Sequence, residues 1–154
     1  MDEEEFRASL SRAIARHARD AVSRGVWTAA EADAASISEF DQLLPRGWTT
    51  PGFHFRKVVQ EQDGATVGET WFNVRKLGGK VQLWIDWLWV DPDRRRQGIA
   101  TEALRLLEEE ARNAGADRMG LHVLADNTAA IELYTRLGYT STSVRMTRPL
   151  NPRG

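Results

Sequence analysis

Residues 90–101 read Val-Asp-Pro-Asp-Arg-Arg-Arg-Gln-Gly-Ile-Ala-Thr, and this stretch joins an apolar run to an amphipathic one. Asp91-Pro92 ends the apolar run, because proline cannot donate to a strand ladder. From residue 98 to residue 114, alanine and leucine recur at helical spacing, and Gly115 then ends the pattern. The stretch therefore predicts a strand, a polar turn and a helix that begins with small residues.

The chemistry of such a turn favours an anionic ligand. The first turn of a helix leaves backbone N–H groups without partners, and the helix dipole adds positive potential there. Gly98 lets a phosphate approach the backbone, and the run Arg94–Arg96 adds charge. The alternative interpretation is that Gly98 only eases a tight turn and the arginines are solvated. The stretch is neither a nucleotide P-loop, since no Gly-Lys-Ser/Thr follows, nor a dinucleotide fingerprint, since two of its glycines are missing.

The rest of the chain predicts alternating helices and strands around this turn. Upstream, two helices cover residues 3–24 and 28–44, the second opening on the capping-box pattern Thr28-Ala-Ala-Glu31. Turn residues then separate runs that read as an antiparallel meander, at residues 53–61, 66–76 and 80–90. Downstream we expect a strand at 118–125, a helix at 127–137 capped by Asn127, and one strand or a tight pair at 139–150. The expected fold class is α/β, an α+β mixed sheet covered by helices.

Composition limits the class of protein. The 154 residues favour one domain, and a net charge of −1 argues against nucleic acid as a partner. The chain has no cysteine, which excludes disulfides and thiolate metal sites, and we expect no metal. It opens on Met1-Asp2-Glu3-Glu4-Glu5, unlike a signal peptide, and no apolar run approaches the roughly 18 residues of a membrane span. We therefore expect a cytoplasmic protein without a membrane partner.

A second segment places two polar side chains on one helix face. Asn127 and Tyr134 lie seven residues apart, or about two helical turns, so both could face one ligand. On spacing alone, a core tyrosine beside Ile131 and Leu137 is the simpler interpretation.

Together the two segments resemble the GNAT family of N-acetyltransferases. Arg95-x-x-Gly98-x-Ala100 resembles the family's pyrophosphate motif, and Leu88–Pro92 resembles the strand end before it. Asn127 to Tyr134, followed by Gly138-Tyr139, resembles the second signature, in the same order and at a similar separation. Arg96 stands where glycine is common, and Ala100 replaces the final glycine. The resemblance implies a single domain over 1–154, with a variable helical acceptor side at 1–50, an acetyl-CoA-binding core at 53–150 and splayed central strands.

The resemblance also implies roles for individual residues. Backbone amides from Arg96 to Thr101 would hold the pyrophosphate of acetyl-CoA, and Tyr134 would protonate the departing thiolate. An amide near Val90 would polarise the thioester carbonyl. The residues expected to bind acetyl-CoA are Leu88, Val90, Arg95, Arg96, Gln97, Gly98, Ala100, Thr101, Asn127 and Tyr134.

The amine acceptor must lose a proton before it attacks. Asp86 lies four residues before Val90, so both should point to one side of the strand, and it is the first candidate for the base. Glu69 on the neighbouring strand is the second, and either could instead be a solvated or ion-paired carboxylate. These groups favour a primary amine over an alcohol or a carboxylate-rich molecule. Strand alternation also predicts that Trp84 faces away from Trp87 and Trp89.

Three functions remain open on the sequence. The first is an acetyl-CoA-dependent N-acetyltransferase acting on a small-molecule or peptide amine, by direct attack in a ternary complex. The second is a non-catalytic relative that binds acyl-CoA, and the third is a variant that uses another acyl donor. The sequence also leaves open a homodimer as the assembly.

Overall fold

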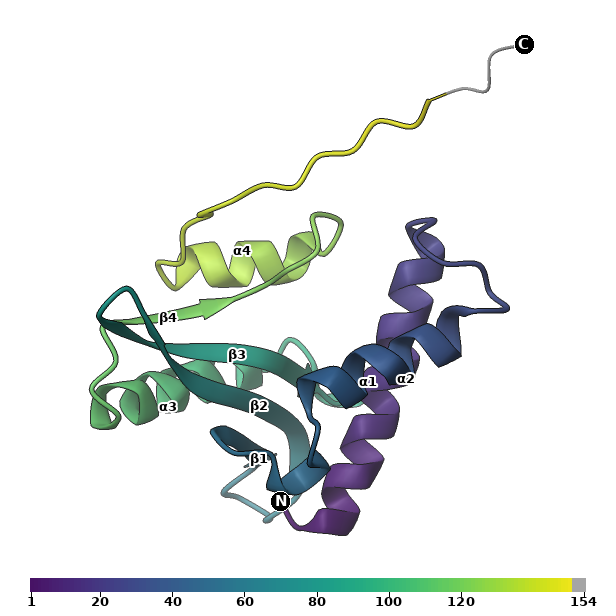
Figure 1. The fold of residues 1–154 in the computed structure, drawn as a ribbon. Coiled ribbons are helices and arrows are strands. Elements are labelled where there is room, and N and C mark those ends of the chain that lie inside the picture. The colour runs from purple at the N-terminus through teal and green to yellow at the C-terminus, as the bar shows by residue number, and fades with distance from the viewer. Residues whose placement is uncertain (151–154) are drawn as a thin grey trace. The chain divides into compact units, whose positions relative to one another are not determined.

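The computed structural model describes residues 1–150, which fall into two units, Met1–His122 and the segment from Val123 on, each described by itself. Within the described residues, no helix is both long and apolar enough to cross a membrane. The second unit holds α4 (Thr128–Arg136). The first unit holds, in chain order, α1 (Glu3–Ser23), α2 (Ala32–Leu43), η1 (Gly47–Thr49), β1 (Phe53–Val59), β2 (Thr66–Leu77), β3 (Lys80–Val90), η2 (Pro92–Arg94), α3 (Ile99–Asn113) and β4 (Arg118–Leu121) (Figure 1).

The sheet of the first unit is mixed, as predicted. Its strand order is β1-β2-β3-β4, with β1, β2 and β3 antiparallel and β4 parallel to β3. Within the first unit, α1 and α2 lie on one face of this sheet and α3 lies on the other (Figure 1). On one face, Trp71 of β2 donates a hydrogen bond from Nε1 to the Oγ atom of Ser9 in α1. On the other, Arg56 of β1 reaches Glu110 of α3. The fold class predicted from the sequence is therefore confirmed.

An aromatic core holds α1 against the sheet. Phe6 of α1 packs on Phe55 with ring centroids 4.6 Å apart, and Trp71 lies 5.8 Å from Phe6 and is fully buried. Such aromatic pairs contribute about 0.5–1.5 kcal/mol each beyond the apolar area that they bury. Ser9 lies in this core because its hydroxyl accepts the indole N–H of Trp71 at 3.0 Å. The core thus fixes which face of α1 is turned toward β2 and β3.

Several element boundaries differ from the prediction. The first strand ends at Val59 and not at residue 61, and β4 ends at Leu121 and not at residue 125. Helix α2 begins at Ala32, four residues later than expected. The Thr28 hydroxyl donates to the Glu31 carboxylate at 2.7 Å and caps no N–H group of α2, while the Thr28 carbonyl accepts the N–H groups of Glu31 and Ala32 and closes a turn before the helix.

The expected last strand is absent. Within the described residues 139–150 no strand is present, although the sequence alternates as a strand would. A strand needs a neighbouring backbone to hydrogen-bond, and alternation alone does not provide one. Val144 and Met146, two apolar residues of this segment, are 77% and 87% exposed. The sheet consequently has four strands, where the sequence had predicted at least five.

Gly68 allows β2 and β3 to approach closely next to the turn at residues 91–98. It pairs with Val90, and a Cβ atom added at this position would lie 2.5 Å from the carbonyl oxygen of Trp89. Since a backbone atom cannot move aside, we expect Gly68→Ala to destabilise the fold by about 1–3 kcal/mol. Thermal denaturation would measure this as a melting temperature lowered by several degrees. Thr66→Ala, at the exposed start of β2, is the control, and an equal effect of the two substitutions would contradict the prediction.

Candidate active site

The turn between β3 and α3 exposes a continuous row of backbone donors. The carboxylate of Asp91 accepts the N–H of Asp93 at 3.0 Å, which shapes η2. Arg96 and Gly98 then adopt positive φ angles of 59° and 80° before α3 begins at Ile99. An added Cβ atom at Gly98 would meet no atom within 4 Å, so the space in front of this turn is open.

The amides of this turn are available to a ligand. Within residues 1–150, none of the six N–H groups from Arg96 to Thr101 has a hydrogen-bond acceptor. Gln97 and Thr101 are exposed and Ala100 is half-buried. The side chain of Arg95 turns back, and its Nε donates to the carbonyl oxygen of Val90 at 3.1 Å. Consecutive unpartnered amides at a helix N-terminus form a site for phosphate oxygens.

The second half of β3 has an open edge. The parallel ladder with β4 covers only Gln82–Ile85 of β3, so within the described chain residues 86–90 have no strand on that side. The N–H of Asp91 donates to the carbonyl of Val67 at 2.9 Å. Because inward and outward backbone groups alternate along an antiparallel strand, those of Leu88 and Val90 point away from β2 toward the open edge. An extended ligand arm can therefore hydrogen-bond to these two residues.

A β-bulge places Asp86 at the point where the ladder ends. Trp71 pairs with Trp87 while Phe72 pairs with Ile85, so Asp86 is the extra residue on β3. The bulge reverses two predictions from simple alternation. Trp84, Trp87 and Trp89 pair with the alternating residues Asn73, Trp71 and Glu69 and so share one face of the sheet. Asp86 bonds to Asn73 on that face, whereas Val90 pairs with Gly68 on the other.

The environment of Asp86 tunes its acidity. Its side chain is only 8% exposed, and burial raises the pKa of this carboxyl from 3.8 to about 6. The Arg75 guanidinium, 3.3 Å away, and the hydrogen bond donated by Asn73 lower the pKa and offset part of that rise. Asp86 therefore titrates near neutral pH, where a carboxylate can both accept and release a proton.

Glu69 has a different environment. Its residue is 4% exposed, and its carboxylate accepts hydrogen bonds from Arg12 of α1 at 2.5 Å and 3.3 Å and from the Trp87 indole at 3.0 Å. The Arg12 guanidinium also lies over the Trp89 ring, 5.1 Å from its centroid. This network connects α1 to β2 and β3. Glu69 is thus compensated by its protein partners and does not stand free toward a ligand.

A cavity of about 460 Å³ opens beside this network. One face of α1 forms one wall, Trp87 and Trp89 of β3 form another, and Pro92 and Arg95 of the turn close one side. The cavity therefore reaches from the strand that carries Asp86 to the turn with the free amides, and its size suits a small-molecule ligand.

The second unit holds the other two expected residues. The Asn127 side chain accepts the N–H of Ala130 at 3.3 Å and so caps α4, as predicted. Tyr134 lies on α4 with its ring 5.5 Å from the ring of Tyr139, and burial raises the pKa of its phenol. The tyrosine consequently remains protonated and able to donate throughout the neutral range.

Three side chains that the sequence did not single out shape the site. Arg12 compensates Glu69, while Arg75 and Asn73 contact Asp86. Alternation along β2 places Asn73 and Arg75 on the face of Glu69, which is a signal that the sequence does carry. Arg12 carries no comparable signal, because only the packing of α1 brings it to the sheet.

Known proteins resemble this chain over most of its length. The acetyltransferase (GNAT) family model matches residues 19–139. The uncharacterized N-acetyltransferase YdgE of Bacillus subtilis is 32% identical over 150 residues, which cover 97% of this chain and 95% of that protein. The crystal structure of the putative acetyltransferase YycN, also from Bacillus subtilis, is 31% identical and superposes with a TM-score of 0.92, covering 99% of this chain and 96% of that one.

A third relative matches a shorter part of this chain. The mycothiol acetyltransferase of Clavibacter sepedonicus is 29% identical over 106 residues, which cover 69% of this chain and 33% of that protein. The family match and the two Bacillus proteins span both segments that suggested a transferase, the turn at Arg95–Ala100 and the helix at Asn127–Tyr134. The chain belongs to the GNAT family of acetyltransferases and is itself an N-acetyltransferase.

Proposed function

We propose that this N-acetyltransferase moves the acetyl group of acetyl-CoA to a primary amine, by direct attack within a ternary complex. Acetyl transfer from acetyl-CoA is the general reaction of the family. The observation that carries the proposal is the row of six amides, from Arg96 to Thr101, that lack acceptors within residues 1–150. Together with the open space at Gly98, these donors fit a pyrophosphate.

The proposed donor site continues along β3. The outward backbone groups of Leu88 and Val90 would pair with the pantetheine arm, and the Val90 amide would stabilise negative charge on the thioester oxygen. Arg95, Arg96 and Gln97 would surround the pyrophosphate, with Ala100 and Thr101 in the first turn of α3. Asn127 would contribute the amide nitrogen of its side chain, since its oxygen caps α4.

The proposed chemistry moves protons as well as the acetyl group. Asp86 accepts one from the acceptor ammonium, and the free amine nitrogen then forms a bond to the thioester carbon. As the carbon–sulfur bond breaks, Tyr134 gives its proton to the leaving sulfur, and the nitrogen, now bonded to the acyl carbon, releases its second proton to solvent, from which the Tyr134 phenolate is reprotonated. The products are an amide and coenzyme A. The raised pKa values of Asp86 and Tyr134 support these roles, because one group can be ionised at pH 7–8 while the other stays protonated.

Glu69 remains the second candidate for the base. Its compensation by Arg12 and Trp87 supports a positioning role instead, in which it holds Arg12 and both tryptophans beside the cavity. Because α1 contributes a wall of that cavity, we place the acceptor side of the enzyme in the N-terminal helices.

Substituting Gly98 tests the donor site. In Gly98→Glu, a carboxylate would occupy the open space in front of the amides and repel the pyrophosphate. Acetyl-CoA at about 100 times its dissociation constant stabilises a protein by about 2.7 kcal/mol, which a thermal-shift assay detects as a rise of several degrees. We expect the wild type to show this rise and Gly98→Glu to lose it.

Gly115→Glu is the matched control. Gly115 lies at the other end of α3 with a φ of 70° and, like Gly98, has open space around an added Cβ atom. Both substitutions strain a left-handed position by about 1–2 kcal/mol, but only one adds charge at the turn. If both variants keep the wild-type response to acetyl-CoA, the turn does not bind the donor.

A further inference from the structure

The cavity between α1 and β3 has a charge that the proposed reaction does not explain. Resting on the proposed acetyl transfer, we infer that the acceptor amine also carries an acidic group, a carboxylate or a phosphate, and that Arg19 binds this group. The acceptor class is thus an amino acid or a similar anionic amine with an apolar body.

Charge compensation within the cavity points to Arg19. Four arginines line it, and no acidic residue is among the described residues that do so. Arg12 is neutralised by Glu69, and Arg16 by Asp20 at 3.0 Å. Within residues 1–150, neither Arg19 nor Arg95 has a carboxylate partner. Two uncompensated guanidinium groups at one cavity favour an anion there.

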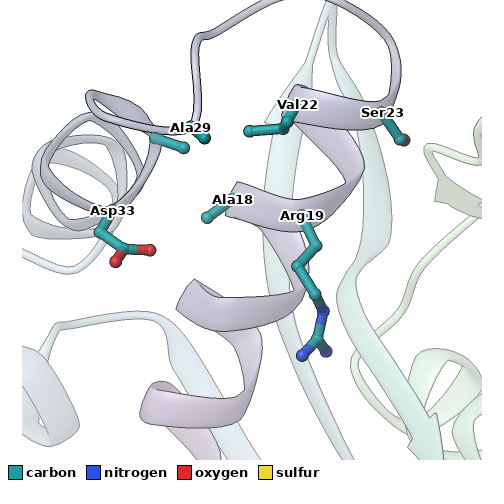
Figure 2. A pocket seen from close by; sticks show the side chains of 7 residues that line it. Ala18, Arg19, Val22, Ser23, Ala29 and Asp33 are labelled. Atoms are coloured by element: carbon teal, nitrogen blue, oxygen red, sulfur yellow. The ribbon is translucent and has the colours of Figure 1, made fainter.

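Arg19 is the better candidate of the two for the acceptor. Arg95 belongs to the turn proposed to hold the pyrophosphate, so a phosphate of acetyl-CoA could satisfy it. Arg19 lies on α1, outside that turn, and is exposed. In Figure 2 its side chain extends along α1 and not toward Ala29 or Asp33 of the neighbouring segment. The charge of Arg19 is therefore left for the other ligand of the cavity.

The opposite wall suits the apolar body of such an acceptor. Trp87 and Trp89 line the cavity, and their positions are held by Glu69 and by the Arg12 guanidinium above Trp89. Asp86 directly precedes Trp87, and the bulge turns it to the same face of β3. The amine of such an acceptor would thus be directed to Asp86 and its acidic group to Arg19, while its apolar body would contact Trp87 and Trp89.

A second cavity on the same helix is a weaker candidate. It measures about 350 Å³ and lies between α1 and the segment that leads into α2 (Figure 2). Arg19 lines this cavity too, together with Asp33 and the small or apolar residues Ala18, Val22, Ser23, Ala29 and Ala32. Its lining includes no residue of β3, so an acceptor there would have no path along the strand that carries Asp86.

Matched pairs of amines test the inference. Phenylalanine and phenethylamine differ only by a carboxylate, as do tyrosine and tyramine, and phosphoethanolamine and ethanolamine differ by a phosphate. We expect the wild type to favour the acidic member of at least one pair by about tenfold or more in kcat/KM, the usual contribution of a charge-assisted hydrogen bond. Arg19→Gln should lose this preference, Arg19→Lys should keep part of it, and the KM for acetyl-CoA should not change in either.

Arg7→Gln is the control, because Arg7 is an exposed arginine of α1 that pairs with Glu3 and lies outside the cavity. Equilibrium binding of the same amines in the presence of coenzyme A is measured beside turnover. Binding of acidic amines without acetylation would overturn the proposed function and keep this inference. Acetylation of neutral amines alone, no binding of any acidic amine, or an unchanged preference in Arg19→Gln would overturn the inference.

Discussion

Tyr134→Phe is expected to slow acetyl transfer by about 10²–10⁴-fold, the usual size of a general-acid contribution. The substitution keeps the ring that packs 5.5 Å from Tyr139 and removes only the hydroxyl. Without that proton, the sulfur must leave as an unprotonated thiolate, while the binding of acetyl-CoA through the turn at residues 96–101 is untouched. The loss should therefore appear in kcat, with the acetyl-CoA thermal shift preserved.

Tyr139→Phe is the matched control for this variant. It removes a hydroxyl from the neighbouring ring of the same segment, and we expect turnover close to that of the wild type. Rates must be measured under conditions where chemistry limits turnover, for example by single-turnover quenching. If Tyr134→Phe retains wild-type turnover there, Tyr134 is a packing residue and the leaving thiolate takes its proton from solvent.

The sequence predicted most elements because local residues determine where they end. The bounds of β3 agree with the prediction at both ends, since Gly78-Gly79 and Asp91-Pro92 each stop a strand whatever lies around it. The helix α3 was predicted to within a residue for the same reason, with Gly98 before it and Gly115 after it. The position of the turn at residues 91–98 was predicted for the same reason, because Asp91-Pro92 and Gly98 mark its two ends.

The features that the sequence did not predict depend on how strands pair with each other and how helices pack on the sheet. The bulge at Asp86 arises from the register of β3 against β2, and it moved Trp84 and Asp86 relative to what alternation predicts. The segment 139–150 alternates like a strand but has no partner strand in the described chain. Similarly, the approach of Arg12 to Glu69 follows from the packing of Phe6 and Ser9 of α1 on Trp71, residues more than sixty positions away along the chain.

The candidate site likewise combines features that local sequence determines with features that depend on packing. The amides at Arg96–Thr101 were found from sequence because a strand, a turn and a helix in succession create them. The two carboxylates were proposed from the sequence as well and stay proposals, but the sequence did not predict their surroundings. Arg75 and Asn73 contact one of them and Arg12 the other, and these contacts separate a titratable Asp86 from a compensated Glu69.

Asp86→Asn is expected to have opposite effects on catalysis and on stability. Loss of the base should lower kcat by about 10²–10⁴-fold on a good amine acceptor. In the wild type kcat/KM should rise as pH increases through about 6, because Asp86 must be ionised to accept the proton, and Asp86→Asn should lack this rise. Asp41→Asn, on the exposed surface of α2, should behave like the wild type in both measurements.

The sign of the stability effect follows from the direction of the pKa shift. Folding raises the pKa of Asp86 from 3.8 to about 6, so the folded state binds a proton more tightly than the unfolded state. The contribution of this group to stability is therefore fully present below pH 3.8 and is lost as pH rises to about 6. A shift of roughly two units corresponds to at most about 3 kcal/mol.

Asparagine mimics the protonated carboxyl, so above pH 7 Asp86→Asn should be more stable than the wild type by about 1–3 kcal/mol. Loss of the ion pair between Arg75 and Asp86 reduces this gain. Near pH 4 the two proteins should unfold at nearly the same denaturant concentration. Urea titrations at pH 4, 6 and 8, run beside the pH–rate profiles, measure both effects on the same samples. A variant that is slower and less stable at every pH would mark Asp86 as a structural partner of Arg75, and Glu69 or a water molecule would then take the proton.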